Sequence, residues 1–151
     1  MKIVALTKQD LPDLAHLYEQ FRGEVSSLQD MRETFRRLQR NTSYTLLGVR
    51  EGGRLVASVM GILCEELYGR CRPFMVVEDV IVDQAHRRRG IGSLLMRAIE
   101  EEAFRNDCSY IMLVTDAARL EALGFYESLG YHPDRYRACK KYLCAAERKE
   151  R

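Results

Sequence analysis

Two neighbouring acids, Glu78 and Asp79, interrupt the apolar run of residues 74–82. A carboxylate inside an apolar strand is costly unless it is paired or takes part in chemistry. One such task is to accept a proton from a primary amine, whose pKa near 10.4 leaves about one molecule in a thousand neutral at pH 7. We therefore treat Glu78 as a candidate general base, acting through a water molecule, with Asp79 in support.

The strand itself limits how these two acids can act. Side chains alternate between the faces of a strand, so we expect Glu78 and Asp79 to point to opposite faces. Only one of them could then reach a reacting group directly. The alternative is that one of the acids merely forms an ion pair with an arginine.

A loop with three arginines and two glycines follows the same strand and leads directly into an amphipathic helix pattern. The first N–H groups of a helix lack intrahelical partners and carry partial positive charge, and glycine allows a ligand to approach the backbone closely. Such a strand-loop-helix predicts a diphosphate site. The alternative is a tight turn with a solvated basic face. No Lys-Ser or Lys-Thr pair follows Gly92, and Leu95 occupies the place of a third glycine, so nucleoside triphosphates and dinucleotides are disfavoured.

The elements that must position these residues follow from the hydrophobic pattern. Their order is strand, two helices, three strands, helix, strand, helix and a closing strand region, which predicts an α/β fold (an α+β mixed sheet), mostly antiparallel and flanked by about four helices. The strand-helix-strand unit of residues 74–115 requires a parallel pair. Expected strands are residues 3–6, 44–50, 54–64, 74–83, 110–115 and one or two within 131–143. Expected helices begin after Asp10, Ser27 and near Gly92, and the last covers residues 118–129.

Two segments together resemble one known family. Residues 87–92, Arg-Arg-Arg-Gly-Ile-Gly, resemble the (Gln/Arg)-x-x-Gly-x-(Gly/Ala) signature of the GCN5-related N-acetyltransferase (GNAT) superfamily. Residues 122–131, Ala-Leu-Gly-Phe-Tyr-Glu-Ser-Leu-Gly-Tyr, are similar to its Ala-x-x-Phe-Tyr-x-x-x-Gly-(Phe/Tyr) segment. The order of the segments and of the elements agrees with that family. Arg119 departs from it, because many members carry an asparagine there.

The resemblance implies acetyl-CoA as co-substrate and a parallel strand pair that splays apart around its pantetheine arm. It implies that Tyr126 donates a proton to the departing coenzyme sulfur. The alternative is that Tyr126 is a core aromatic. The implied cofactor-binding residues are Val80, Ile81 and Val82 beside the pantetheine arm, and Arg87, Arg88, Arg89, Gly90, Ile91, Gly92 and Ser93 around the diphosphate.

Composition excludes several other classes of protein. The chain has 151 residues and a formal net charge of +2, so we expect no nucleic acid as partner. No long apolar stretch or secretion signal occurs, and the five cysteines have no CxxC spacing, so we expect a cytoplasmic protein without a membrane or metal partner. We expect one domain over residues 1–145 and a solvated tail over 146–151.

The expected function is therefore N-acetyl transfer to a small primary amine, directly within a ternary complex, because no cysteine has a histidine partner for a covalent step. Two alternatives stay open: acetylation of a protein lysine or N-terminus, and a coenzyme A-binding sensor without turnover. Arg22, Tyr68, Arg70 and Arg72 are candidate acceptor-site residues. A homodimer could form if the closing strand of residues 138–143 is exposed at a sheet edge.

Overall fold

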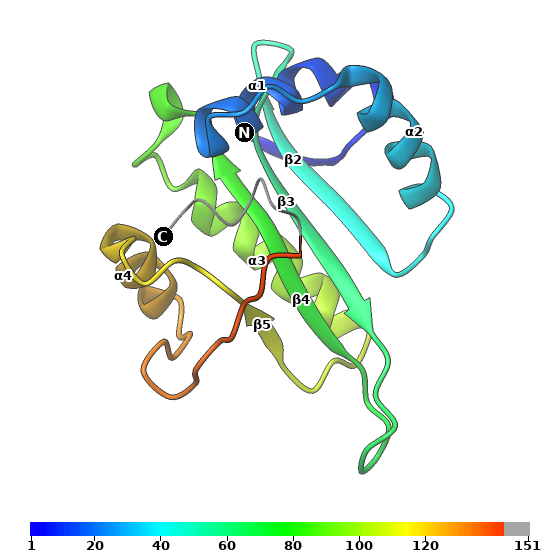
Figure 1. The fold of residues 1–151 in the computed structure, drawn as a ribbon, viewed down its shortest axis with the longest axis vertical. Helices are drawn as coiled ribbons and strands as arrows, with labels where there is room; N and C mark the ends of the chain where they lie inside the picture. Colours follow the sequence, from blue (N-terminus) through cyan, green and yellow to red (C-terminus); the bar gives the residue numbers. More distant parts are fainter. Residues whose placement is uncertain (144–151) are drawn as a thin grey trace. The chain divides into compact units, whose positions relative to one another are not determined.

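The computed structural model describes residues 1–143, and within them five strands form one mixed sheet in the order β1-β2-β3-β4-β5 (Figure 1). The first four strands run antiparallel to their neighbours, and β5 runs parallel to β4. This confirms the predicted mixed sheet with a parallel pair. The strands are β1 (Lys2–Ala5), β2 (Tyr44–Glu51), β3 (Arg54–Cys64), β4 (Phe74–Val82) and β5 (Ile111–Leu113).

Helix α3 (Ile91–Arg105) makes the crossover between the parallel strands. Its buried residues include Ile91, Leu95 and Ile99, spaced by four, so one apolar stripe faces the sheet. Gly61 of β3 lies under this stripe, where an added Cβ would come within 3.1 Å of the Ile99 Cδ1 atom. The glycine therefore lets the helix lie close to the strand.

Helices α1 (Leu11–Arg22) and α2 (Leu28–Leu38) cover the opposite face of the sheet. The Ser27 hydroxyl accepts a hydrogen bond from the Asp30 N–H at 3.3 Å, which confirms the predicted cap of α2. Asp10 precedes α1 but does not cap it, contrary to expectation. Instead it belongs to the short 3-10 turn of Lys8–Asp10 and accepts hydrogen bonds from Thr7.

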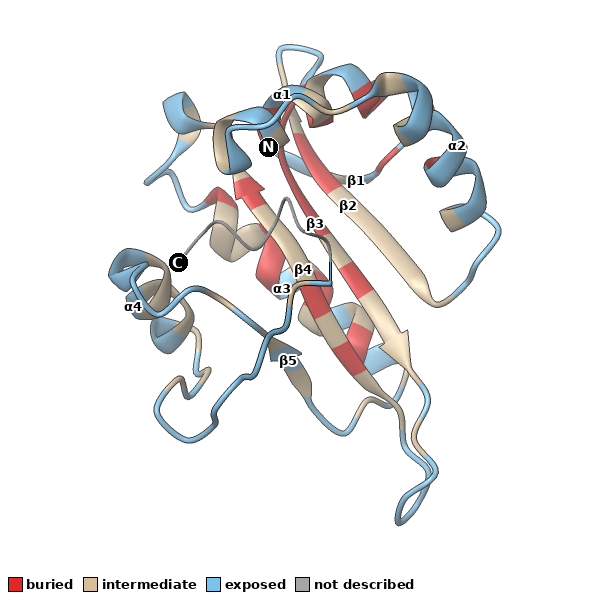
Figure 2. Ribbon diagram, in the orientation of Figure 1, coloured by how far each residue is buried: buried red, intermediate tan, exposed pale blue. Residues whose placement is uncertain are grey.

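The core on this face joins the helices to the middle of the sheet. Leu11, Leu14 and Leu17 of α1 pack in one buried cluster with Leu55 of β3 and Ile81 of β4. Buried residues, shown in red, concentrate on the central strands in Figure 2. The strand that carries the candidate base is thus held by apolar contacts close to the two acids.

The chain divides into two compact units, one of residues 1–113 and one that begins at Val114. Helix α4 (Leu120–Ser128) lies in the second unit. The closing strands expected within residues 131–143 are not present: this described segment consists of turns and irregular chain. It contains no Val, Ile or Thr and several charged residues, a composition that disfavours strands. The edge strand on which the dimer argument rested is therefore missing, while the tail of residues 146–151 lies outside the described residues.

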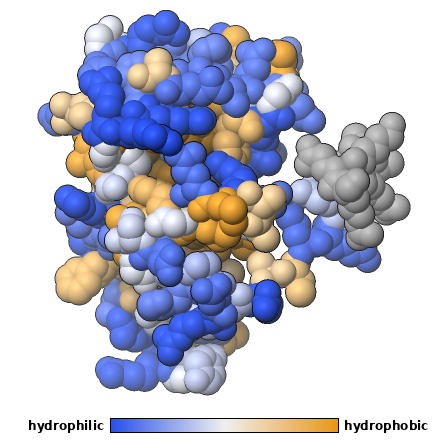
Figure 3. Space-filling view, turned by 90° about the vertical axis from the view of Figure 1, so that its left-hand side faces the viewer, coloured by the Kyte–Doolittle hydropathy of each residue, from blue (hydrophilic) through white to orange (hydrophobic). Residues whose placement is uncertain are grey.

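The surface reflects the high charge content of the sequence. Hydrophilic side chains, in blue, dominate the face in Figure 3, with apolar groups in orange between them. Within residues 1–143, no helix has the length and apolar character that crossing a membrane requires. Cys64, Cys71, Cys108 and Cys139 are free thiols.

Candidate active site

A β-bulge in β4 lies at the two acids. On one side of it Glu78 pairs with Met60, and on the other Ile81 pairs with Ser58, so two residues of β4 oppose one residue of β3. Asp79 takes up this mismatch with a φ of 52°. This left-handed conformation is uncommon for residues other than glycine, although Asp and Asn tolerate it better than most.

The bulge changes which way the acids face. Residues directly opposite each other share a face of the sheet, and so do residues two apart on β3. Glu78 therefore lies on the same face as Ile81, which packs against α1. Asp79 also contacts α1, so the expectation that the two acids point to opposite faces is wrong. The bulge interrupts the alternation on which that expectation depended.

Two side chains of α1 hold the Asp79 carboxylate. The Tyr18 hydroxyl donates to Oδ2 at 3.1 Å, and the Arg22 guanidinium donates to Oδ1 at 3.1 Å. Burial, together with the Asp79 charge, raises the pKa of the Tyr18 phenol above its ordinary value, so this hydroxyl stays protonated and a donor. Asp79 thus forms the ion pair that was the alternative for one of the acids.

The edge of β4 that faces β5 is paired over only a short length in the described residues. The parallel pairing runs from Met75 with Ile111 to Val77 with Leu113. The strand then continues to Val82, paired on its other side with β3. Because the Ile81 side chain is buried in the core, only its backbone can face a ligand at this edge. This length of strand, residues 78–82, includes the three residues expected beside the pantetheine arm.

The loop before α3 has two left-handed residues. Arg88 and Gly90 adopt this conformation, with φ of 57° and 76°. Gly90 precedes the first turn of α3 without a side-chain hydrogen bond to cap it, and a Cβ added there would meet nothing within 4 Å. Ile91 is buried, so its side chain anchors the turn. A helix start of this kind is a candidate position for an anion, because its first N–H groups lack intrahelical partners.

The arginines of the loop have different partners. Arg87 Nε donates to the Val82 carbonyl at 3.2 Å and so ties the loop to the end of β4. Arg89 makes a bidentate ion pair with Glu51, at 2.9 Å and 2.7 Å. The charge of Arg89 is therefore largely matched within the protein.

Tyr126 lies in the second unit, on α4. Its ring contacts Phe125 at a centroid distance of 5.1 Å and Tyr131 at 6.0 Å. The Tyr126 carbonyl accepts hydrogen bonds from the N–H groups of Leu129 and Tyr131, which close the end of the helix. Tyr126 thus belongs to an aromatic cluster and is only partly buried.

Of the candidate acceptor-site residues, Arg22 is the one that contacts a predicted site residue, Asp79. Arg72 instead binds the Asp107 carboxylate at 2.9 Å and the carbonyl groups of Asp107 and Cys108. It ties its loop to the segment before β5. Tyr68 is highly exposed.

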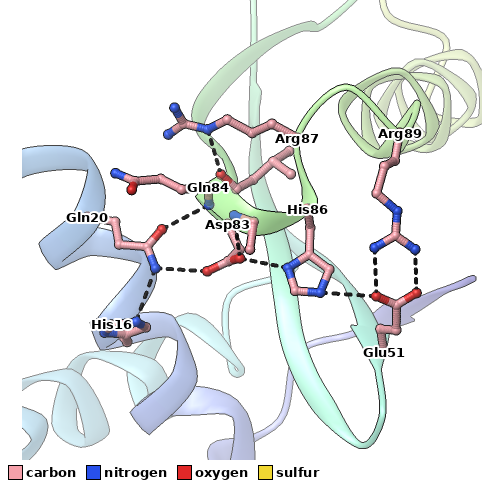
Figure 4. A network of polar contacts seen from close by, with 10 residues as sticks. His16, Gln20, Glu51, Asp83, Gln84, His86, Arg87 and Arg89 are labelled. Atoms are coloured by element: carbon pink, nitrogen blue, oxygen red, sulfur yellow. Dashed lines mark hydrogen bonds and ion pairs between the residues drawn. The ribbon is translucent and has the colours of Figure 1, made fainter.

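The structure adds polar residues around the loop that sequence reasoning missed. His86 lies between the carboxylates of Asp83 and Glu51, and Gln20 of α1 binds Asp83 (Figure 4). The spacing of Asp83 and His86, three apart just before the loop, was a visible signal. Nothing local in the sequence connects them with Glu51 or Gln20. Across residues 1–143, no group of three or more His, Cys, Asp or Glu side chains is arranged to hold a metal ion.

Comparison with known proteins agrees with the fold. Residues 11–131 match the Acetyltransferase (GNAT) family. Over 79 residues the chain is 33% identical to glucosamine 6-phosphate N-acetyltransferase 1 of Oryza sativa subsp. japonica, a match that covers 52% of this chain. The match covers 46% of the length of this curated relative, so the chain spans about half of it.

Solved structures give the same result. A candidate acetyltransferase from Agrobacterium tumefaciens str. C58 superposes with a TM-score of 0.87 at 26% identity, covering 94% of this chain and 100% of the other. Glucosamine-6-phosphate N-acetyltransferase of Arabidopsis thaliana gives a TM-score of 0.85 at 19% identity, covering 95% and 98%, which supports the fold alone. The chain belongs to the GNAT family of acetyltransferases. Members of this family use acetyl-CoA as co-substrate.

Proposed function

We propose that this acetyltransferase moves the acetyl group of acetyl-CoA to a primary amine of a small molecule, directly within a ternary complex. The observation that carries the proposal is the start of α3, where Gly90 provides no side-chain cap and a Cβ added to it would meet nothing within 4 Å. The N–H groups of residues 87–93 would bind the diphosphate. The backbone of Val80, Ile81 and Val82 would lie along the pantetheine arm.

Each step of the reaction then has a residue assigned to it. Glu78, on the α1 side of the sheet, accepts the proton of the ammonium group through a water molecule. Bound acetyl-CoA supplies the activated acyl group. The backbone N–H near Ile81 stabilises negative charge on the carbonyl oxygen, and Tyr126 protonates the departing sulfur.

The acceptor class is inferred from the relatives and from the charges near the bulge. A curated relative is named for glucosamine 6-phosphate, an amino sugar that carries a phosphate. Arg22, which contacts Asp79, is a cation on the same side as Glu78 and could attract such an anion. We therefore expect a small amine, with amino-sugar phosphates first among the acceptors to test.

A thiol-release assay with acetyl-CoA tests this proposal. The panel contains glucosamine 6-phosphate, glucosamine, a polyamine, an aminoglycoside and lysine or N-terminal peptides. We expect turnover with at least one small amine and none with the peptides. Turnover with peptides alone would assign a protein acceptor, and coenzyme binding without turnover on any acceptor would leave a sensor role instead.

A further inference from the structure

Both ring nitrogens of His86 contact carboxylates. Nδ1 lies 2.6 Å from Asp83 Oδ1, and Nε2 lies 3.0 Å from Glu51 Oε2. The ring therefore bridges two carboxylates that lie far apart in the chain.

The two carboxylates are themselves anchored to other elements (Figure 4). Asp83 accepts from Gln20 Nε2 at 2.8 Å, and Gln20 Oε1 accepts from the Gln84 N–H at 3.1 Å. Glu51, at the end of β2, accepts two hydrogen bonds from the guanidinium group of Arg89 in the loop. His86 thus joins a contact from α1 to a contact from the β2–β3 hairpin, directly before residues 87–93.

Both carboxylates are ionised in this arrangement. The hydrogen bond to His86, followed by that from Gln20, lowers the pKa of Asp83. The hydrogen bond from Arg89 is the main cause that lowers the pKa of Glu51, and His86 adds to it. Both anions therefore persist throughout the range in which a histidine changes charge.

We propose that His86, bridging Asp83 and Glu51, is a positioning residue that holds the loop of residues 87–93 in the shape that binds coenzyme A. This inference rests on the proposed function, since it assigns that loop to the coenzyme. His86 does not touch the coenzyme in this proposal. It acts through Asp83, Glu51 and Arg89.

The proposal makes coenzyme binding depend on both contacts of the ring. Asp83 is tied to α1 through Gln20, and Glu51 is tied to the loop through Arg89. A side chain at position 86 that does not span the two carboxylates breaks at least one of these links, and the loop loses an anchor.

Calorimetry with coenzyme A at neutral pH tests the proposal on wild type and on His86→Gln. We expect the variant to bind roughly five- to tenfold more weakly, because it loses at least one of the two links. The kcat at saturating acetyl-CoA should stay within about twofold, because only binding is affected.

His132→Gln is the matched control, since it makes the same change at an exposed histidine of the second unit. Its affinity should equal that of wild type. A wild-type affinity in His86→Gln, or a loss of kcat as large as the loss of affinity, overturns the inference. If that variant fails to fold, Glu51→Gln replaces it and should weaken coenzyme binding to a similar degree. No coenzyme binding by wild type would overturn the proposed function itself.

Discussion

Glu78 and Asp79 are adjacent in the chain, and the bulge brings both to the side of α1. The Tyr18 hydroxyl and the Arg22 guanidinium bind the Asp79 carboxylate and tie it to α1. We keep Glu78 as the candidate base and Asp79 as the supporting residue. Substitution of each acid in turn tests whether the two differ in their contribution to turnover.

Glu78→Gln should lower kcat by about a hundredfold and leave coenzyme affinity unchanged, because a neutral amide cannot take the proton. The loss should shrink as the pH approaches the pKa of the amine, where the acceptor is neutral without help. Thiol release measured across pH checks both points. Asp79→Asn is the paired control and should cost less than about tenfold. Equal losses in the two variants would remove Glu78 from its assigned role.

For Tyr126 the two alternatives are a catalytic role as proton donor and a packing role in the aromatic cluster. Tyr126→Phe keeps the ring among Phe125 and Tyr131 and removes only the hydroxyl. If the hydroxyl protonates the sulfur, kcat should fall by about a hundredfold with unchanged affinity for coenzyme A. Steady-state kinetics and calorimetry measure the two effects separately. Tyr131→Phe, in the same cluster, should have little effect on kcat, and parallel losses of turnover and affinity in Tyr126→Phe would indicate a structural role.

At the scale of elements, the start of α3 and the end of α1 offer a matched pair of glycines. Gly90 has φ 76° and ψ 4°, and Gly23 has φ 73° and ψ 8°. An added Cβ would meet nothing within 4 Å at either position. The two glycines therefore differ in location but hardly in conformation or space.

Gly90→Glu should abolish coenzyme binding, a loss of more than about a hundredfold, because it puts a carboxylate where the diphosphate would lie. Gly23→Glu should leave the affinity at the wild-type value. Each variant should lose about 1 to 2 kcal/mol of unfolding free energy from left-handed strain. Calorimetry and thermal melts measure these quantities, and a wild-type affinity in Gly90→Glu would take the loop out of the site.

The sequence predicted the elements better than their local irregularities. Hydrophobic spacing located the antiparallel strands and the α3 crossover, because burial on one face imposes a period on the sequence. The bulge at Asp79 has no such signal, since it depends on how β4 meets β3. The shortened β5 and the missing closing strand likewise depend on tertiary pairing, which apolar composition alone does not establish.

In the candidate site, too, the sequence predicted a local motif but not the long-range contacts. The loop of residues 87–93 was visible because the proposed diphosphate site requires glycines at fixed spacing before a helix. The ion pair of Arg89 with Glu51 joins residues 38 apart in the chain. The contact of Tyr18 with Asp79 joins residues 61 apart. Such long-range contacts follow from the topology, and one sequence does not reveal them.

At the scale of the whole molecule, an ion pair links the start of α1 to the sheet. Asp10, only 5% exposed, accepts from Arg50 at 2.6 Å and 2.7 Å. Burial alone would raise the pKa of Asp10, but the hydrogen bonds from Arg50 and Thr7 outweigh it and lower the pKa below the ordinary value. The unfolded chain therefore binds this proton more readily than the folded one.

Asp10→Asn should lower the unfolding free energy at neutral pH by about 2 kcal/mol, or roughly 4 to 8 °C in Tm. The sign follows from the lowered pKa: the stabilisation is fully present above about pH 4 and is lost as the pH falls through the folded-state pKa. Thermal melts of both proteins between about pH 2.5 and 7 check this. The gap in Tm should narrow on acidification, and a gap independent of pH would mean that the Asp10 charge does not stabilise the fold.

The pairing of Arg89 with Glu51 also bears on how dissolved salt should affect the enzyme. Small ions screen the attraction between a coenzyme phosphate and an arginine charge at the surface. Amide N–H groups at a helix start carry no net charge, and they bind through short, directed contacts. Because Arg89 is paired with Glu51 within the protein, the proposed coenzyme contact would depend more on those amides than on Arg89. Coenzyme affinity should then weaken less with rising ionic strength than three consecutive arginines in the sequence would suggest.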